Sequence, residues 1–179
     1  MLGGARSGKS AFAEQQATQS GLSVLYIATA HAGDGEMAQR IAHHRARRPE
    51  SWTSLEVPLH LAQALQQHAT ADSCIIVDCL TLWLTNLFFA GRAATQAEAG
   101  EAIDCSLLTT ETNALLAVLP QLPGRIIFVS NEVGWGIVPE KPIARAFADE
   151  QGRLNQRIAA VCDRVSLVVA GIPVELKRN

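Results

Sequence analysis

Residues 3–10, Gly-Gly-Ala-Arg-Ser-Gly-Lys-Ser, carry the clearest pattern for chemistry in this sequence. A glycine, four residues and then Gly-Lys-Ser match the phosphate-binding P-loop, in which backbone N–H groups close around phosphate oxygens. In such a loop Lys9 reaches the β- and γ-phosphates and Ser10 holds Mg²⁺. The alternative is a chance match, a glycine-rich turn before a helix. The pattern predicts a nucleotide site, which the rest of the sequence must support.

An acidic residue after an apolar run is the second element that such a site requires. Asp78 follows Ile-Ile-Val at residues 75–77, so it is expected at the end of a buried strand, where it could bind the metal or its water shell. A carboxylate in this position is also common as a helix cap or loop residue. Together the P-loop and Asp78 favour a nucleotide site over coincidence.

A cluster of basic residues is the third unusual feature of a chain whose net charge is −2. It comprises Arg40, His43, His44, Arg45, Arg47 and Arg48. On a helix, Arg40, His44 and Arg47 or Arg48 share one face, because their spacings are three to four residues. A solvated amphipathic helix is the alternative interpretation. The concentration of cations predicts a polyphosphate clamp, in which the arginines keep a histidine neutral and able to attack phosphorus.

The elements that position these residues follow from apolar periodicity. Buried strands are predicted at residues 24–29, 74–79, 125–130 and 165–170. Helices are predicted at residues 10–20, 37–47, 60–68, 101–119 and 143–162. The alternation predicts an α/β fold, a mostly parallel sheet flanked by helices, with sites at the carboxyl ends of the strands. Residues 91–100 are expected to form an exposed connection.

The strand that should precede the P-loop is missing or truncated, because only Met1 and Leu2 come before Gly3. Loss of a central strand exposes the backbone groups of its neighbours, so we expect poor stability or weak nucleotide binding if this chain is complete. A start placed too late, or an incomplete sequence, is the explanation we prefer. An intact mass of the native protein equal to that of this chain would defeat it.

Length and composition favour a single domain over residues 1–179, of which 48% are hydrophobic. The net charge of −2 argues against a nucleic-acid binder, which needs an excess of Lys and Arg.

The apolar stretch at residues 80–90 is too short to span a bilayer, and its large side chains are expected in the core or a subunit interface. The cysteines lack metal-ligand spacing and indicate reduced, mostly buried thiols of a cytoplasmic protein: Cys74, Cys79, Cys105 and Cys162.

Several segments together resemble the bifunctional adenosylcobinamide kinase/adenosylcobinamide-phosphate guanylyltransferase family of cobalamin biosynthesis. They are GGARSGKS, VLYIATA, GEMAQRIAHHRARRP, WTSLE, SNEVGWGIVPE and GRLNQRIA, and the resemblance runs nearly end to end. The segment SNEVGWGIVPE is the most specific, since a generic kinase has no reason to place this string after a core strand. The resemblance implies a P-loop NTPase-like, RecA-like fold and a homotrimer.

The resemblance also implies two reactions and the residues that perform them. The enzyme phosphorylates the hydroxyl of adenosylcobinamide with GTP or ATP, and then transfers GMP from GTP to the new phosphate, giving adenosylcobinamide-GDP. The GMP passes through a guanylylated histidine, which maps to His44, with His43 as the fallback. Ser10 and Asp78 hold Mg²⁺ in this interpretation. The implied nucleotide contacts are Gly3, Gly4, Ala5, Arg6, Ser7, Gly8, Lys9, Ser10, Ala28, Thr29, Ala30, Arg45, Ala46, Arg47, Arg48, Glu56 and Asp78.

Some questions stay open at this level. Glu56 either binds the nucleoside or is one polar residue on the extended piece at residues 52–57. The sequence does not assign a general base for the kinase step, for which Asp78 and Glu132 are candidates. A P-loop kinase for another small alcohol has no need of His44. A nucleotide-dependent switch or assembly ATPase predicts no covalent nucleotide and a surface for a macromolecular partner.

Overall fold

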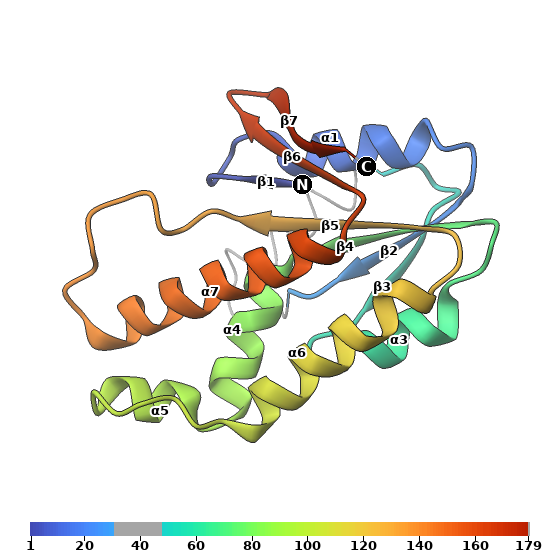
Figure 1. Cartoon of the computed structure of the whole chain (residues 1–179). Helices are drawn as coiled ribbons and strands as arrows, with labels where there is room; N and C mark the ends of the chain where they lie inside the picture. Colours follow the sequence, from blue (N-terminus) through green and yellow to red (C-terminus); the bar gives the residue numbers. More distant parts are fainter. Residues whose placement is uncertain (31–47, 179) are drawn as a thin grey trace.

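The computed structural model describes residues 1–30 and 48–178, which form a sheet with helices on both faces (Figure 1). The strands are β1 (Leu2–Gly3), β2 (Ser23–Ala28), β3 (Thr53–Glu56), β4 (Ser73–Asp78), β5 (Arg125–Asn131), β6 (Arg164–Val169) and β7 (Ile172–Arg178). The helices are α1 (Lys9–Thr18), α3 (Leu61–His68), α4 (Leu80–Ala90), α5 (Ala93–Glu98), α6 (Ser106–Val118) and α7 (Pro142–Val161), with a 3-10 turn η1 (Leu119–Gln121).

The sheet has the strand order β3-β2-β4-β5-β1-β6-β7. Neighbouring strands are parallel except for β6 and β7, which form an antiparallel hairpin. One strand, β5, separates the strand before the P-loop from β4, which ends in Asp78. The predicted α/β fold, a mostly parallel sheet flanked by helices, is confirmed. The carboxyl ends of the parallel strands lie at the left in Figure 1.

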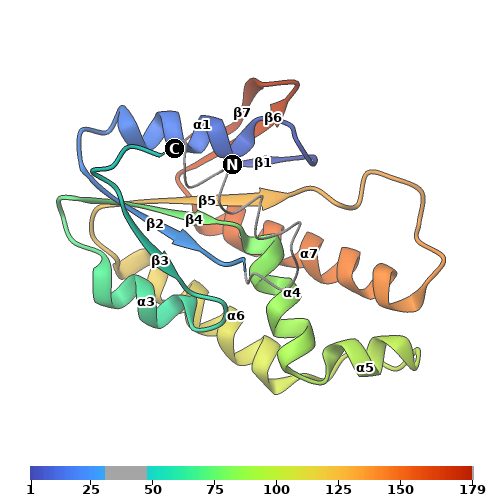
Figure 2. The same cartoon turned by 180° about the vertical axis from the view of Figure 1, so that it is seen from behind.

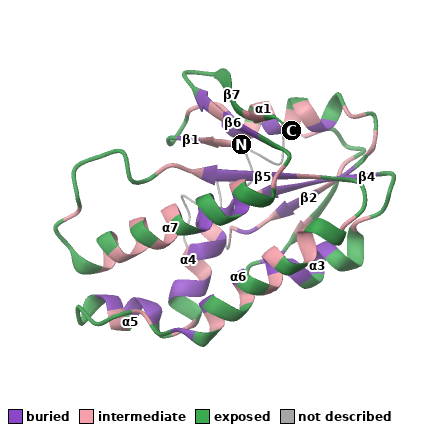
Figure 3. Ribbon diagram, viewed as in Figure 1, coloured by how far each residue is buried: buried purple, intermediate pink, exposed green. Residues whose placement is uncertain are grey.

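Both faces of the central strands are covered, which explains why these strands read as continuous apolar runs. Among the described helices, α1 lies on one face and α3, α6 and α7 lie on the other (Figures 1 and 2). Along β4, Ile75 and Val77 pack into the cluster under α3, α4 and α6, whereas Ile76 packs against Ala13 and neighbouring residues of α1. Successive side chains of a strand point to opposite faces, so both sets are apolar. The central strands are accordingly buried (Figure 3).

The largest apolar side chains of α4 belong to the core, as expected, while one residue at its end does not. Trp83, Leu84, Leu87 and Phe88 are at most 1% exposed, but Phe89 is 67% exposed.

The cysteines are all free thiols, three of them buried, which confirms their predicted state.

Residues 91–100 are not the exposed connection that the sequence suggested. They contain α5, whose Ala93, Ala94 and Ala97 are buried. Small side chains let this helix pack closely beside α4 and α7, although the segment's composition resembles that of a loop. The sequence patterns also did not predict α4 or β7.

The strand before the P-loop is present, but it is only two residues long. Leu2 lies opposite Ser130 of β5 and Leu167 of β6. The Met1 amino group donates to the Phe128 carbonyl at 2.7 Å, and burial lowers the pKa of this amine to about 6, although the nearby Cys162 acts in the opposite direction. The sequence suggested a missing or a truncated strand, and of these two alternatives the structure agrees with the second, because a strand of two residues is present.

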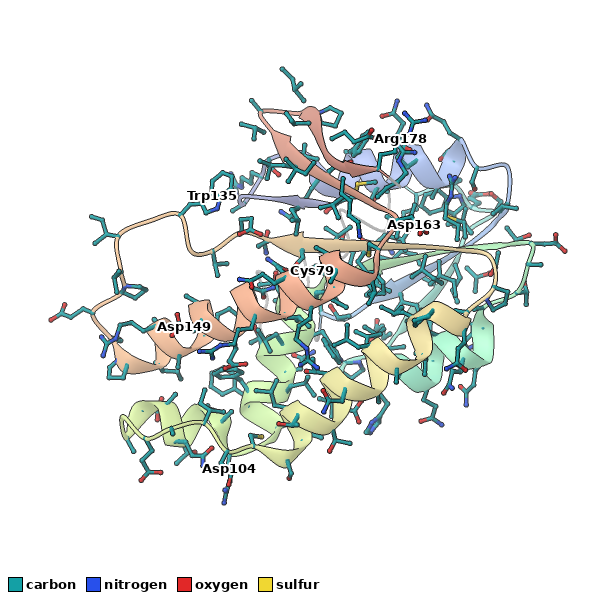
Figure 4. The ribbon with its side chains drawn as sticks, viewed as in Figure 1. Cys79, Asp104, Trp135, Asp149, Asp163 and Arg178 are labelled. Atoms are coloured by element: carbon teal, nitrogen blue, oxygen red, sulfur yellow. The ribbon has the colours of Figure 1, made fainter. Side chains whose placement is uncertain are left out.

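A cavity of about 340 Å³ lies beside Met1, between the facing parts of β5 and β6. Its lining includes Met1, Arg125, Phe128, Val165 and Asp163, the last of which is labelled in Figure 4. The paired part of β5 on this side is confined to Ser130 and Asn131, opposite β1. The cavity therefore lies beyond Met1, beside the part of β5 that β1 does not reach.

A chain extended before Met1 by Ile-Val-Ile-Val is expected to be more stable. These residues reach along β5 toward Arg125, fill the cavity and move the charged amine into solvent. Burial of each aliphatic side chain contributes about 1.5–3 kcal/mol and ordering each residue costs about 1–2 kcal/mol, so the net gain is about 2–4 kcal/mol. Thermal denaturation measures it. A Gly-Ser-Gly-Ser extension is the control, and equal melting temperatures for the two extensions would contradict the prediction.

Candidate nucleotide-binding site

The predicted P-loop connects β1 to α1 and ends at Gly8, whose left-handed backbone has φ 95° at the N-cap of the helix. Lys9 begins the helix, and its Nζ donates to the Gly4 carbonyl at 3.0 Å. Lys9 is 8% exposed, and burial lowers the pKa of its ammonium group, an effect that the nearby Asp78 carboxylate partly offsets. A helix N-terminus, the backbone of a glycine-rich loop and a lysine thus meet here, an arrangement that suits a phosphate group.

The turn between β6 and β7 supports this loop from a distant part of the sequence. The Gly171 N–H donates to the Ser7 carbonyl at 2.8 Å. A Cβ atom on Gly8 would lie 3.1 Å from the Gly171 Cα, and a Cβ on Gly3 would lie 2.5 Å from both Ser7 Oγ and the Val168 carbonyl. Glycine is therefore required at both positions because neighbouring atoms of the protein lie close to the loop backbone, whether or not a phosphate also approaches it.

Asp78 lies at the carboxyl end of β4 and is held by a tyrosine that the sequence patterns did not single out. The Tyr26 hydroxyl donates to Asp78 Oδ2 at 2.7 Å. The Arg48 guanidinium stacks over the Tyr26 ring, 3.3 Å from its centroid. Two predicted contacts, Arg48 and Asp78, are thus joined through Tyr26. In the sequence, only one feature could have pointed to Tyr26, namely a single phenol within a mostly apolar strand.

Tyr26 is expected to resist ionisation in the folded protein. Its ring is 2% exposed, and its pKa is raised first by burial and then by the charge and hydrogen bond of Asp78. Because the unfolded chain releases this proton near pH 10 and the folded chain keeps it, each pH unit above about 10 lowers the free energy of unfolding by about 1.4 kcal/mol. Tyr26 is the only tyrosine, so phenolate absorbance reports it directly.

In that titration, the native protein should gain phenolate absorbance only as it unfolds in alkali. The same chain in urea provides the control, with an ordinary titration near pH 10. Ionisation near pH 10 with an unchanged circular dichroism spectrum would contradict the prediction.

The segment after β2 is fixed against Asp78 by hydrogen bonds. Thr29 is fully buried, its hydroxyl donates to the Cys79 carbonyl at 2.7 Å, and the Cys79 N–H donates back to that oxygen at 2.8 Å. Asn86 donates to the Thr29 carbonyl at 2.7 Å. Burial raises the pKa of the Cys79 thiol to about 11, so this thiol stays protonated. Ala28 and Ala30 flank Thr29 at the same sheet edge.

Glu56 is exposed at the end of β3, the outermost strand on this side of the sheet. Four strand spacings separate β3 from β1, which corresponds to roughly 19 Å. Glu56 therefore lies too far away to touch a phosphate in the P-loop, and only the nucleoside end of a ligand along this edge could reach it.

The other predicted contacts, His44, Arg45, Ala46 and Arg47, lie outside the described residues, as does the predicted helix 37–47.

Ser10, the predicted second metal ligand, lies in the first turn of α1, where it follows Lys9. Within residues 1–30 and 48–178, no three or more His, Cys, Asp or Glu side chains gather as a metal site. A magnesium ion bound with a nucleotide needs only one or two protein ligands besides phosphates and water. Ser10 and Asp78 fit that smaller requirement.

The segment SNEVGWGIVPE leaves the end of β5 at the same sheet edge and leads into α7. Its first residue beyond the strand, Glu132, donates its backbone N–H to the Gly3 carbonyl at 3.2 Å. Farther along, Trp135 and Ile137 are largely exposed, and Figure 4 shows Trp135 on this connection.

In the described part of the chain, no helix is both long and apolar enough to cross a membrane.

Residues 1–176 match the family described as cobinamide kinase / cobinamide phosphate guanyltransferase. The chain belongs to this family. It is 54% identical over 177 residues to the bifunctional adenosylcobalamin biosynthesis protein CobP of Pseudomonas aeruginosa, covering 99% of this chain and 95% of that protein. It is 43% identical over 181 residues to the corresponding CobU of Salmonella typhimurium, covering 99% and 98%. The resemblance inferred from the sequence is confirmed.

Among solved structures, the fold is similar to that of the RadB recombinase. The TM-score is 0.48 at 17% sequence identity, and the alignment covers 93% of this chain and 73% of that chain.

Proposed function

We propose that this protein performs both reactions of its family. It phosphorylates the hydroxyl of adenosylcobinamide with GTP or ATP, and it then transfers GMP from GTP to the resulting phosphate, giving adenosylcobinamide-GDP and pyrophosphate. The family match over residues 1–176, combined with a formed P-loop in which Lys9 is held at the Gly4 carbonyl, carries the proposal.

The arrangement of charges suits both transfers. Phosphoryl transfer places negative charge on the departing β-phosphate, and guanylyl transfer places it on departing pyrophosphate. In this proposal Lys9, the P-loop N–H groups and a Mg²⁺ ion held by Ser10 and Asp78 would stabilise either charge, because all of them would surround the phosphates. The ion would supply Lewis-acid stabilisation of the phosphate oxygens. His44 would accept GMP as a phosphoramidate, so that one nucleotide site serves two acceptors.

Labelling with α-labelled GTP and Mg²⁺ tests the proposal. We expect label on the chain that is stable to base and labile to acid, and no protein label from γ-labelled GTP. The His44→Ala variant should lose the label and retain kinase activity, while His43→Ala, the matched control, should retain both. Absence of protein-bound label in the unaltered enzyme would defeat the guanylyltransferase mechanism.

The quaternary structure and compartment belong to the same proposal. We expect a homotrimer in the cytoplasm, acting on a corrinoid and not on nucleic acid. Light scattering on the purified protein measures the assembly, and a monomeric mass at micromolar concentration would contradict the trimer.

A further inference from the structure

A buried amide network on α7 fixes the carboxylate of Glu132. The Asn155 Nδ2 donates to Glu132 Oε1 at 2.9 Å and to the Asn131 carbonyl at 3.1 Å. The Asn155 Oδ1 accepts from Ser130 Oγ at 2.7 Å and from Gln151 Nε2 at 3.0 Å. Gln151 Nε2 also donates to Ser130 Oγ at 3.0 Å. Both donors and both lone pairs of the Asn155 amide are in use, so its rotation would break four hydrogen bonds.

Because this network is buried, breaking its hydrogen bonds would cost considerable free energy. Gln151 is fully buried, and Ser130 and Asn155 are 2% and 6% exposed. Side-chain hydrogen bonds in such surroundings are stronger than in water, and an unpaired group there is costly. Glu132 itself is half-buried at the edge of this network. Asn155, held by Ser130 and Gln151, thus fixes one oxygen of the Glu132 carboxylate, and the other oxygen has no hydrogen-bond partner among residues 1–30 and 48–178.

The position of Glu132 places it at the phosphate site. Its backbone N–H donates to the Gly3 carbonyl at 3.2 Å, and Asn131 lies opposite Gly3 in the parallel register of β5 and β1. The Asn131 N–H donates to Thr81 Oγ1 at 2.9 Å, in the first turn after Asp78. Glu132 therefore lies between the start of the P-loop, the segment after β4 and α7.

We propose that Glu132 is the general base of the kinase step and that Asn155 is its positioning residue; this inference rests on the proposed function. The acceptor hydroxyl oxygen attacks the γ-phosphorus, a new O–P bond forms, and the bond from phosphorus to the departing nucleoside diphosphate breaks. The hydroxyl proton passes to Glu132, which then releases it to water. Asp78 is the less suitable base, because Tyr26 occupies its Oδ2 and the other oxygen is directed to the metal in the proposed function.

The other transfers do not require this base. A neutral imidazole and a phosphate anion each attack phosphorus with a lone pair that is already available, whereas an alcohol must lose its proton. Removing Glu132 should therefore separate the kinase from the guanylyl-transfer steps. This selectivity is the property that a merely structural carboxylate lacks.

The test compares Glu132→Gln with Glu140→Gln, an exposed acid on the same connection. With adenosylcobinamide and GTP, Glu132→Gln should lower kinase kcat by about 10²–10³-fold. The KM for GTP, the α-GTP label on the protein, and transfer of GMP to supplied adenosylcobinamide phosphate should change less than about threefold, as should every rate of Glu140→Gln. Unchanged kinase activity, or equal losses in kinase and labelling, would overturn the inference.

A double-mutant cycle tests Asn155. Asn155→Ala should lower kinase kcat by about tenfold or more without changing the KM for GTP, and it should have little further effect in the Glu132→Gln background, because the two residues act as one unit. Additive losses would overturn the positioning role. If the unaltered protein lacks kinase activity altogether, the proposed function fails; if only the variants behave otherwise, the inference about Glu132 fails.

Discussion

Lys9→Met is expected to abolish both transfer reactions while leaving the folded protein at least as stable as before. In the proposed function the Lys9 ammonium stabilises the charge on both departing groups, and we expect its loss to cost about 10³-fold or more in each kcat. Burial lowers the pKa of Lys9, so its charged form is disfavoured by folding. Methionine has a similar length and no charge to desolvate, which offsets the lost hydrogen bond to Gly4.

Kinase rates, α-GTP labelling and urea denaturation measure the two halves of this prediction. Lys141→Met is the matched control, because Lys141 is exposed at the start of α7. The control should retain activity and stability. Labelling of Lys9→Met within tenfold of the unaltered protein would contradict the phosphate role, and a large loss of stability would show that Lys9 mainly holds the loop.

Gly3→Ala is expected to damage both stability and activity. The added methyl group would lie 2.5 Å from Ser7 Oγ and 2.5 Å from the Val168 carbonyl, so the loop or β6 must move. Overpacking of this kind costs typically about 1–3 kcal/mol, and we expect the upper end because a backbone carbonyl cannot rotate away. A displacement of about 1 Å at reacting groups costs about 10²-fold in rate, so both transfer reactions should fall by at least that factor.

The neighbouring glycine provides the control for Gly3. A Cβ on Gly4 meets no atom within 4 Å, so Gly4→Ala should leave the free energy of unfolding nearly unchanged. Adding Ser7→Gly to Gly3→Ala should not restore stability, since the contact with the Val168 carbonyl remains. Equal stability of Gly3→Ala and Gly4→Ala in urea titrations would refute the steric account.

The parts of the fold that sequence patterns predicted are those with a strong local signal. β2, β4, β5 and β6 are apolar because helices or the hairpin cover them, and α1 follows from the P-loop spacing. β7 was not predicted because Ile172, Val174 and Leu176 are exposed and alternate with polar residues and a proline. α4 was not predicted because it is buried on most sides and shows little helical periodicity.

The candidate site divides in a similar way. The P-loop and Asp78 are contiguous motifs that can be found from spacing alone. Tyr26 and Asn155 act on partners 52 and 23 residues away, Asp78 and Glu132, and only the sheet topology shows that these residues meet. A polar residue within a strand or on a long amphipathic helix has many ordinary explanations, so its sequence context could not identify it. The choice of Glu132 over Asp78 as base likewise depended on their separate hydrogen bonds.

The support of the P-loop by the turn after β6 has a consequence for synthesis on the ribosome. The loop is made before β2 to β7, yet Ser7 receives its hydrogen bond from Gly171, which follows it by 164 residues (171 − 7). β1 pairs only with β5 and β6, which are also made late. At about 5–20 residues per second, roughly 8–33 s pass between these residues. Nascent chains should therefore acquire nucleotide binding only after β5, β6 and the turn at Gly171 have been made.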